Sequence, residues 1–367
     1  MDLTLTNNSF QNFNLPIKIV ESLKKLKYTN PTQIQSQSIP PLMEGKDVLA
    51  KSHTGSGKTL AFLIPLLAKI STQKSTGLIL VPTRELALQV FEQVKKFDQL
   101  GHICKSALII GGTPMYPQVK QLWARPNIII GTPGRIIDHL DKKTIPVSAI
   151  NFLVIDEADR MMDMGFLPQV KDIISCLPKE KQTVLFSATF PPDIKKIAHT
   201  FLNEPLLIEN QEKREKPKIK ETHVEVNPNF KGDMLQKLLQ SESGTAIVFV
   251  KTKHKTERLA HMLAKKGFKV GQIHGNRSQN QRQNAIKSFT SGESRILVAT
   301  DIAARGIDVF NVSLIVNFDL PHCSDDYIHR IGRTGRAGLE GKAISLITPE
   351  ERGLWQRMGR VSKSISF

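Results

Sequence analysis

At 367 residues the chain is long enough for two domains, because a single hydrophobic core usually stops growing near ~250 to 300 residues. Hydrophobic residues make up 40% and charged residues 23% of the sequence, which excludes a disordered or fibrous protein. The formal net charge of +17 favours a polyanionic partner, nucleic acid first and an anionic membrane second, although an AT-rich genome that enriches lysine would produce the same balance.

The amino-terminal residues, Met1 to Ser9, are polar and lack the basic-then-apolar order of a secretory leader. The strongest apolar stretch, Leu60 to Ala68, is too short to span a bilayer. The three cysteines, Cys104, Cys176 and Cys323, lie far apart, which favours a reducing compartment over a disulfide framework or zinc site. We therefore expect a soluble, cytoplasmic protein with no membrane partner.

Apolar runs of strand length recur through the first half, and segments with helical spacing, such as Glu85 to Phe97 and Val170 to Leu177, separate them. Such runs are typical of strands buried on both faces of a parallel sheet, and their alternation with helices predicts an α/β fold. The predicted strands are Val48 to Ala50, Leu78 to Val81, Ala107 to Ile110, Ile128 to Ile130, Phe152 to Ile155 and Val184 to Phe186.

The same alternation restarts in the second half and ends with one short helix and a polar tail. Residues 210–220 read NQEKREKPKIK, a charged stretch that predicts a linker between domains 1–209 and 221–367. Because ligands bind at the carboxyl ends of parallel strands, chemistry is expected directly after each strand. The second-half strands are Ala246 to Val250, Ile296 to Ala299, Leu314 to Val316 and Ala343 to Ile347.

A glycine-rich loop lies between the first predicted strand and the apolar, helix-like segment Leu60 to Ile70. Glycines let backbone N–H groups turn toward phosphates, and the following helix N-terminus adds positive potential. We expect Lys58 to reach the β and γ phosphates and Thr59 to ligate Mg²⁺. A plain glycine-rich turn is the alternative. The predicted ATP-binding loop residues are Thr54, Gly55, Ser56, Gly57, Lys58 and Thr59.

Two adjacent carboxylates, Asp156 and Glu157, follow the predicted strand that ends at Ile155. Neighbouring residues of an extended chain point in opposite directions, so one carboxylate can hold the metal while the other faces the attacking water. We assign Asp156 to Mg²⁺ and Glu157 to orienting or deprotonating water. An acidic helix N-terminus is the alternative.

Phosphoryl transfer also needs positive charge near the γ-phosphate, and the segment HRIGRTGR at 329–336 offers Arg333 and Arg336. These arginines lie beyond the predicted linker, so the site would be complete only when the two halves close on each other. ATP would then act as a switch for domain closure. The alternative is a basic loop that binds RNA phosphates.

Together these motifs resemble, in order along nearly the whole chain, those of the DEAD-box ATP-dependent RNA helicases. Residues 156–159 spell DEAD, and SAT follows at 187–189. The resemblance implies two RecA-like domains, each a mostly parallel sheet flanked by helices. Further matching segments are PTRELA at 82–87, GG at 111–112, TPGR at 132–135, TDIAARGID at 300–308 and HRIGRTGR at 329–336.

The resemblance also implies adenine recognition by Gln35, in a segment similar to the family's Q motif, with Phe10 stacking on the base. A glutamine amide can pair with adenine N6 and N7, which would select ATP over GTP. Asp308 would lie near the ribose. Ser187, Thr189 and His329 would couple the nucleotide site to RNA.

An RNA track is implied along both domains, gripping phosphates and sugars without reading the sequence. Such contacts specify neither the RNA nor the assembly, so ribosome assembly and RNA decay both stay open. The track residues are Thr83, Arg84, Gly111, Gly112, Thr132, Pro133, Gly134 and Arg135 in the first domain, and Gly275, Gln279, Arg282 and Thr300 in the second.

Some residues depart from the family pattern. They are Ser52 and His53 in the glycine-rich loop, here called the phosphate loop, Lys27 where glycine is frequent, and Gln33 where proline is frequent. None has an expected catalytic role. Two other functions are alternatives. A DNA helicase or translocase shares the loop and the arginines, and a non-catalytic RNA clamp would not need the intact catalytic residues.

Overall fold

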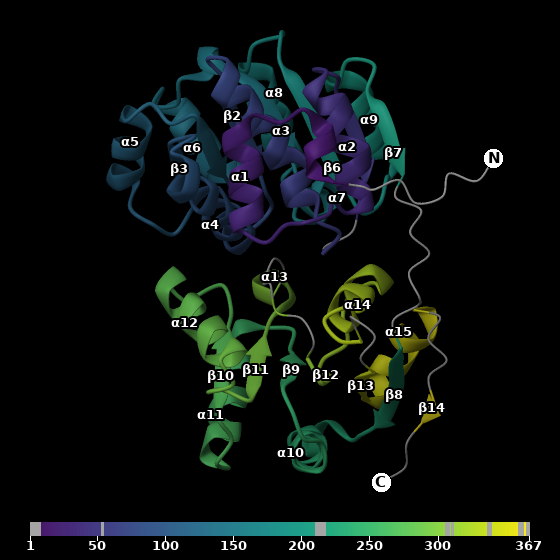
Figure 1. The fold of residues 1–367 in the computed structure, drawn as a ribbon. Coiled ribbons are helices and arrows are strands. Elements are labelled where there is room, and N and C mark those ends of the chain that lie inside the picture. The colour runs from purple at the N-terminus through teal and green to yellow at the C-terminus, as the bar shows by residue number, and fades with distance from the viewer. Residues whose placement is uncertain are drawn as a thin grey trace, which may run out of the picture. The chain divides into compact units, whose positions relative to one another are not determined.

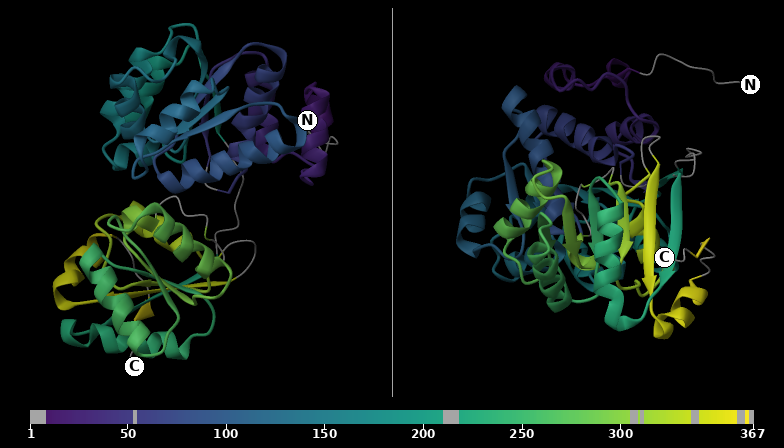
Figure 2. Two further views of the ribbon diagram at one scale, coloured as in Figure 1. Left: turned by 90° about the vertical axis from the view of Figure 1, so that its left-hand side faces the viewer. Right: turned by 90° about the horizontal axis from the view of Figure 1, so that it is seen from below.

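The computed structural model describes residues 9–52, 55–209, 218–304, 309, 312–335, 340–358 and 363–364. The chain divides into two compact units, Met1–Glu212 and Lys213–Phe367. Each contains a parallel sheet with helices on both faces (Figures 1 and 2). Among the helices that the structure describes, none has the length and hydrophobicity that crossing a membrane requires.

The first sheet has seven parallel strands in the order β3-β4-β2-β5-β6-β1-β7. Strands β1 and β6 pair without interruption, from Val48 opposite Val184 to Lys51 opposite Ser187. The strands are β1 (Val48–Lys51), β2 (Thr76–Leu80), β3 (Ser106–Ile109), β4 (Ile128–Gly131), β5 (Ile150–Ile155), β6 (Gln182–Ser187) and β7 (Leu206–Glu209).

Alternate residues of the central strands pack into two separate hydrophobic cores. On β5, Phe152 and Val154 pack with the first four helices, whereas Leu153 and Ile155 pack with the later ones. Burial on both faces explains why these strands read as continuous apolar runs. The helices are α1 (Ile17–Lys25), α2 (Gln33–Met43), α3 (Lys58–Thr72) and α4 (Arg84–Gly101), followed by α5 (Met115–Trp123), α6 (Pro133–Asp141), α7 (Ala158–Asp163), α8 (Leu167–Cys176) and α9 (Pro192–Phe201), with short 3-10 turns at Phe10–Phe13 and Val147–Ala149.

The second sheet also has seven parallel strands, in the order β10-β11-β9-β12-β13-β8-β14. They are β8 (Ile219–Glu225), β9 (Ala246–Phe249), β10 (Val270–Ile273), β11 (Ile296–Ala299), β12 (Leu314–Asn317), β13 (Gly341–Ile347) and the two-residue β14 (Lys363–Ser364). The helices are α10 (Lys231–Ser241), α11 (Lys253–Lys265), α12 (Gln279–Thr290), α13 (Asp301–Ala304), α14 (Ser324–Ile331) and α15 (Arg352–Arg357), with 3-10 turns at Pro228–Phe230 and Pro349–Glu351.

The predicted α/β class with mostly parallel sheets is confirmed, and every strand predicted from an apolar run is present. The predicted linker range differs at its end, because Ile219 and Lys220 pair with Gly341 and Lys342 in the second sheet. Residues 210–217 of that range lie outside the described part of the chain.

Within each unit, all the strands run parallel, so their carboxyl ends share one edge of the sheet. In the first unit this edge carries the phosphate loop after β1, the acidic pair after β5 and Ser187 at the end of β6. The same edge carries the segments after β2, β3 and β4. Motifs far apart in the sequence are thereby neighbours.

Candidate functional site

The phosphate loop joins β1 to the N-terminus of α3. Gly57 has φ of 91° and caps the helix, and Lys58 is its first residue. A Cβ at Gly57 would lie 2.5 Å from Nε2 of Gln35, so this position requires glycine for space as well as for its backbone conformation. The loop therefore presents its backbone and Lys58 at a helix N-terminus, where an anion is favoured.

Lys58 is buried and its ammonium contacts both carboxylates of the acidic pair. Nζ lies 2.7 Å from Oδ1 of Asp156 and 3.2 Å from Oε1 of Glu157. Burial favours the neutral amine, but the two carboxylates outweigh it and raise the pKa of Lys58. Lys58 is therefore a permanent cation at neutral pH, suited to bind phosphate.

The two carboxylates converge on Lys58, although alternation along an extended chain predicts that they diverge. The reason is the backbone of Glu157, which is left-handed with φ of 56° and ψ of 51°. A left-handed backbone is uncommon for a residue other than glycine, and such conformations concentrate at functional sites. Arg160 holds the other oxygen of Glu157, with Nη1 donating to Oε2 at 2.7 Å.

Asp156 is fully buried at the end of β5, and burial is the largest cause of its raised pKa, which Lys58 opposes and Glu157 reinforces. Among the described residues, its carboxylate is satisfied only by the Lys58 ammonium and by the backbone N–H of Glu157, and no other side chain hydrogen-bonds it. A buried carboxylate with so few hydrogen-bond partners fits a hard divalent cation such as Mg²⁺. The described residues hold no cluster of three or more His, Cys, Asp or Glu side chains suited to a metal.

Gln35 connects the predicted adenine-binding segment to the phosphate loop. Its Oε1 accepts from the backbone N–H of Thr32 at 2.9 Å, and its Nε2 donates to the carbonyl of Gly57 at 2.9 Å. Phe10 is only 3% exposed and packs edge-on against Phe13. The amide thus fixes the loop, and base recognition by Gln35 and Phe10 stays a prediction.

Two departures from the family pattern have physical explanations. The hydroxyl of Ser52 hydrogen-bonds that of Ser56, so it supports the phosphate loop from within. Lys27 adopts φ of 61°, a left-handed conformation that glycine reaches more easily. His53 lies outside the described residues, as do the predicted site residues Thr54, Asp308 and Arg336.

The predicted RNA residues of the first unit gather after the adjacent strands β3, β4 and β2. The guanidinium of Arg84 lies against the glycine pair, because a Cβ at Gly112 would be 2.1 Å from its Nη1. Arg135 lies on the first turn of α6, and its Nη1 is 4.0 Å from Sδ of Met115. Thr83, Thr132 and Pro133 are buried, and Gly134 is exposed. The Thr83 side chain caps α4, whereas Thr132 occupies the first position before α6 without a side-chain hydrogen bond to it.

The second unit places its predicted RNA residues after the adjacent strands β10 and β11. Gly275 is exposed, with open space around its Cα, and Thr300 directly follows β11. Gln279 and Arg282 are buried in the first turn of α12, where Nη2 of Arg282 donates to the carbonyl of Ala303 at 3.2 Å. Arg333 is 7% exposed, just beyond α14, and half-buried His329 lies on that helix.

Comparison with known proteins identifies the family to which the chain belongs. Residues 32–197 match the DEAD/DEAH box helicase model, and residues 231–338 match the helicase conserved C-terminal domain. The DEAD-box ATP-dependent RNA helicase CshA of Geobacillus kaustophilus is 40% identical over 97% of this chain and 77% of its own length. The chain belongs to the DEAD-box family of ATP-dependent RNA helicases.

Two further relatives of this DEAD-box helicase agree. The ATP-dependent RNA helicase DbpA of Bacillus subtilis is 42% identical over 94% of this chain and 72% of its own length. The structure of S. cerevisiae Dbp5 bound to RNA and ADP BeF3 is 30% identical, with a TM-score of 0.84 over 98% of this chain and 95% of that one. The predicted family and RecA-like tandem fold are thereby confirmed.

Asp159, the last residue of the DEAD sequence, was not among the predicted site residues, yet it joins two motifs of the helicase. Its Oδ2 accepts from the backbone N–H groups of Ala188 and Thr189 and from the Thr189 hydroxyl, at 3.1, 2.9 and 3.1 Å. Ser187 completes the link by accepting from the Asp159 N–H at 3.1 Å. This network connects the acidic pair to the predicted coupling residues.

Arg330 is a second residue that the prediction did not include. Nε and Nη2 bind the Asp301 carboxylate at 2.6 and 2.7 Å, and Nη1 donates to Oδ1 of Asn317 at 3.0 Å. The guanidinium also lies 4.9 Å from the ring centroid of Phe249. Arg330 therefore ties α14, which leads to Arg333, to the ends of β11 and β12. Its place in the HRIGRTGR segment is the only sequence signal for it.

We expect Arg330→Ala to destabilise the second unit by about 3–5 kcal/mol, because it removes a buried guanidinium and leaves the partly buried Asp301 carboxylate without its partner. Urea unfolding followed by the fluorescence of Trp355, which is buried in that unit, measures the change. Arg352→Ala is the matched control, since its pair with Glu225 is more than half exposed at the arginine and should contribute about 1 kcal/mol or less. Equal effects of the two substitutions would contradict the anchoring role.

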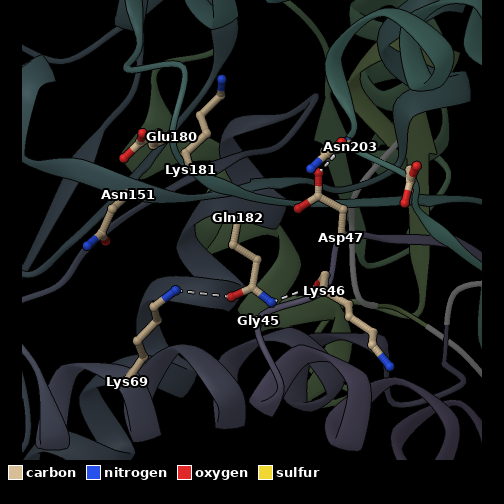
Figure 3. Close-up of a pocket in the computed structure, with 10 residues that line it drawn as sticks. Gly45, Lys46, Asp47, Lys69, Asn151, Glu180, Lys181, Gln182 and Asn203 are labelled. Carbon is tan, nitrogen blue, oxygen red and sulfur yellow. Dashed lines mark hydrogen bonds between the residues drawn. The ribbon is translucent and has the colours of Figure 1, made fainter.

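A cavity of about 540 Å³ opens at the amino-terminal edge of the first sheet, opposite the phosphate loop (Figure 3). Its polar groups are largely paired with one another. Asp47 accepts from the N–H groups of Thr183 and Asn203, and Lys69 donates to Gln182. These bonds join the amino ends of β1, β6 and β7, so we assign the cavity to the structure of the unit. The lining residues are Gly45, Lys46, Asp47, Lys69, Asn151, Glu180, Lys181, Gln182, Asn203 and Glu204.

Proposed function

We propose that the two units of this helicase close on each other when ATP and single-stranded RNA are both bound. The supporting observation is that the charged residues of the nucleotide site are divided between the two units. Lys58, Asp156 and Glu157 belong to the first unit, whereas Arg333 belongs to the second. A γ-phosphate at Lys58 would gain the arginine only on closure, so ATP has a differential affinity for the closed state.

ATP would displace the carboxylates from Lys58, since its phosphates compete for the same ammonium. Thr59 and Asp156 would hold Mg²⁺, which neutralises charge on the phosphate oxygens when bound. The fully buried carboxylate of Asp156, which no described side chain other than Lys58 hydrogen-bonds, supports that assignment. Gln35 would read the adenine edge, and its existing bond to the Gly57 carbonyl would transmit base occupancy to the phosphate loop.

Glu157 would orient or deprotonate the attacking water, with Arg160 holding its second oxygen in place. Arg333 and Arg336 would stabilise the negative charge that develops on the γ-phosphate. After hydrolysis, the lost γ-phosphate removes the attraction between the units. The two units then separate and release the RNA.

RNA would run across the carboxyl edges of both sheets, gripped through its phosphates and sugars. The guanidinium of Arg84 beside Gly111 and Gly112, and the exposed Gly134 and Gly275, support a track of cations and open backbone. The relative Dbp5 has been solved with RNA and ADP BeF3, and the relative Mss116 with ssRNA and UDP-BeF. Closure would bend the bound strand, so that a short duplex loses its partner strand locally or an RNA–protein complex is remodelled.

The expected experimental signature is ATP turnover that rises with single-stranded RNA and not with DNA of the same sequence. Contacts to the 2′-hydroxyl are the physical basis for that selectivity. Steady-state phosphate release at saturating ATP measures both rates. Equal stimulation by the two polymers would favour a DNA helicase or translocase instead. Ribosome assembly and RNA decay are both possible processes for this helicase to act in, and cytoplasmic location stays a prediction.

A further inference from the structure

One face of α5 carries two large aromatic side chains in solvent. Tyr116 is 62% exposed and Trp123 is 67% exposed. With Lys120 they occupy positions i, i+4 and i+7 of the helix, so all three lie on one stripe. Nζ of Lys120 lies 4.8 Å from the centroid of the Tyr116 ring. We call Tyr116, Lys120 and Trp123 the α5 stripe.

The opposite face of α5 fixes the helix firmly against the sheet. Gln118 is buried, and its Nε2 donates to the carbonyl of Ile110 at 3.1 Å and to the Thr113 hydroxyl at 2.7 Å. Oε1 of Gln121 accepts from the N–H of Leu108 on the edge strand β3, at 2.9 Å. Figure 1 shows α5 beside β3 at that edge. The stripe is therefore held outward on a rigid support, and it is not needed for the core.

Charge around the stripe favours a polyanion. Residues 111–137 contain no Asp or Glu, whereas Lys120 and Arg125 are basic, and Arg135 pairs with Asp138 just beyond this range at 3.3 Å. Arg125 is exposed just beyond the end of α5. Exposed aromatic rings interleaved with cations are the arrangement that binds single-stranded nucleic acid, because bases stack on the rings while the cations pair with phosphates.

The stripe also begins where the predicted RNA track of the first unit ends. Met115, the residue before Tyr116, contacts Arg135 through its sulfur, and Gly111 and Gly112 lie in the turn that precedes α5. Tyr116 and Trp123 are about 10 Å apart along the helix axis, so each ring can receive a separate base. A strand leaving the track at Arg135 would meet Tyr116 first and Trp123 later.

We propose that the α5 stripe is an accessory site for single-stranded RNA, which stacks unpaired bases of the strand after it leaves the track. This inference rests on the proposed function, because it extends the same RNA path. The stripe would raise affinity for strands long enough to reach it and would leave short strands unaffected. It adds no sequence readout, since every base offers a face for stacking.

The test compares binding of oligouridines of about 6 and about 20 nucleotides in the presence of a non-hydrolysable ATP analogue. The Tyr116→Ala/Trp123→Ala double variant should bind the long strand about 10-fold more weakly or worse, at unchanged affinity for the short one. Trp123→Phe should retain most of the affinity, because phenylalanine still stacks. Phe230→Ala is the matched control, since Phe230 is 62% exposed in the second unit and should change neither affinity.

Tryptophan fluorescence gives a second, direct readout. The chain has two tryptophans, and Trp355 is buried, so quenching by the long strand should disappear in Trp123→Phe. Suppose instead that the short strand binds and stimulates ATP turnover in both the natural protein and the double variant, while the double substitution changes neither the affinity for the long strand nor the quenching. The stripe inference is then overturned, and the proposed function stands.

Discussion

Glu157→Gln should hydrolyse ATP at least about 10² to 10⁴ times more slowly than the natural protein while still binding ATP and RNA. Glutamine has the same shape as glutamate but cannot accept a proton from water. The substitution also leaves Lys58 and Asp156 in place as the cation and the metal ligand. Single-turnover hydrolysis at saturating RNA measures the loss, and a fluorescent ATP analogue measures binding.

The control for this substitution is Glu180→Gln, an exposed carboxylate at the opposite edge of the same sheet. Its turnover should match the natural protein. If Glu157→Gln also turned over at nearly the natural rate, Glu157 would have no part in activating water. Arg160, which holds its Oε2, would then be a purely structural partner.

Arg333→Ala should lower turnover at saturating ATP by about 10³ to 10⁵, the range for an arginine that stabilises phosphoryl transfer. The large effect is expected because the charge on the γ-phosphate grows as the bond to the leaving group loosens, and a cation supplied on closure meets it there. Arg333→Lys keeps a charge without the planar fork of donors, so it should recover only part of the rate.

The same variant separates this role from RNA binding. If Arg333 instead gripped an RNA phosphate, its loss would weaken RNA binding without nucleotide and reduce the slope of affinity against salt by about one. Turnover at saturating ATP and RNA would then be unchanged. A rate defect that saturating RNA cannot restore supports the arginine finger.

Strands buried on both faces were predictable because each residue of the run must be apolar. β5 and β11 are of this kind. The strands that were not predicted have one face in solvent or contain polar residues. β10 contains Gly271 and Gln272 and is mostly half-buried, and β8 alternates buried residues with charged ones, so its start resembled a linker. Polar alternation and charged linkers differ little in a single sequence.

The site was predictable where a motif specifies its own chemistry, as with the loop that ends at Lys58. Pairings between motifs were not predictable, because they depend on which strands are neighbours. The contact of Lys58 with Glu157 requires the left-handed backbone of Glu157, and the bonds of Asp159 to Thr189 require β5 beside β6. Without a family resemblance, Arg330 would not stand out from the arginines around it.

Completion of the nucleotide site by the second unit can be measured with the chain's own cysteines. Cys176 is exposed in the first unit and Cys323 in the second, whereas burial, aided by Asp98, raises the pKa of Cys104 to about 12 and keeps its thiol unreactive. Dyes on the two exposed thiols then report the distance between the units by single-molecule energy transfer. A second transfer population is predicted when ATP and RNA are both present, and neither alone should produce it. One unchanged distribution under all conditions would contradict a site completed by closure.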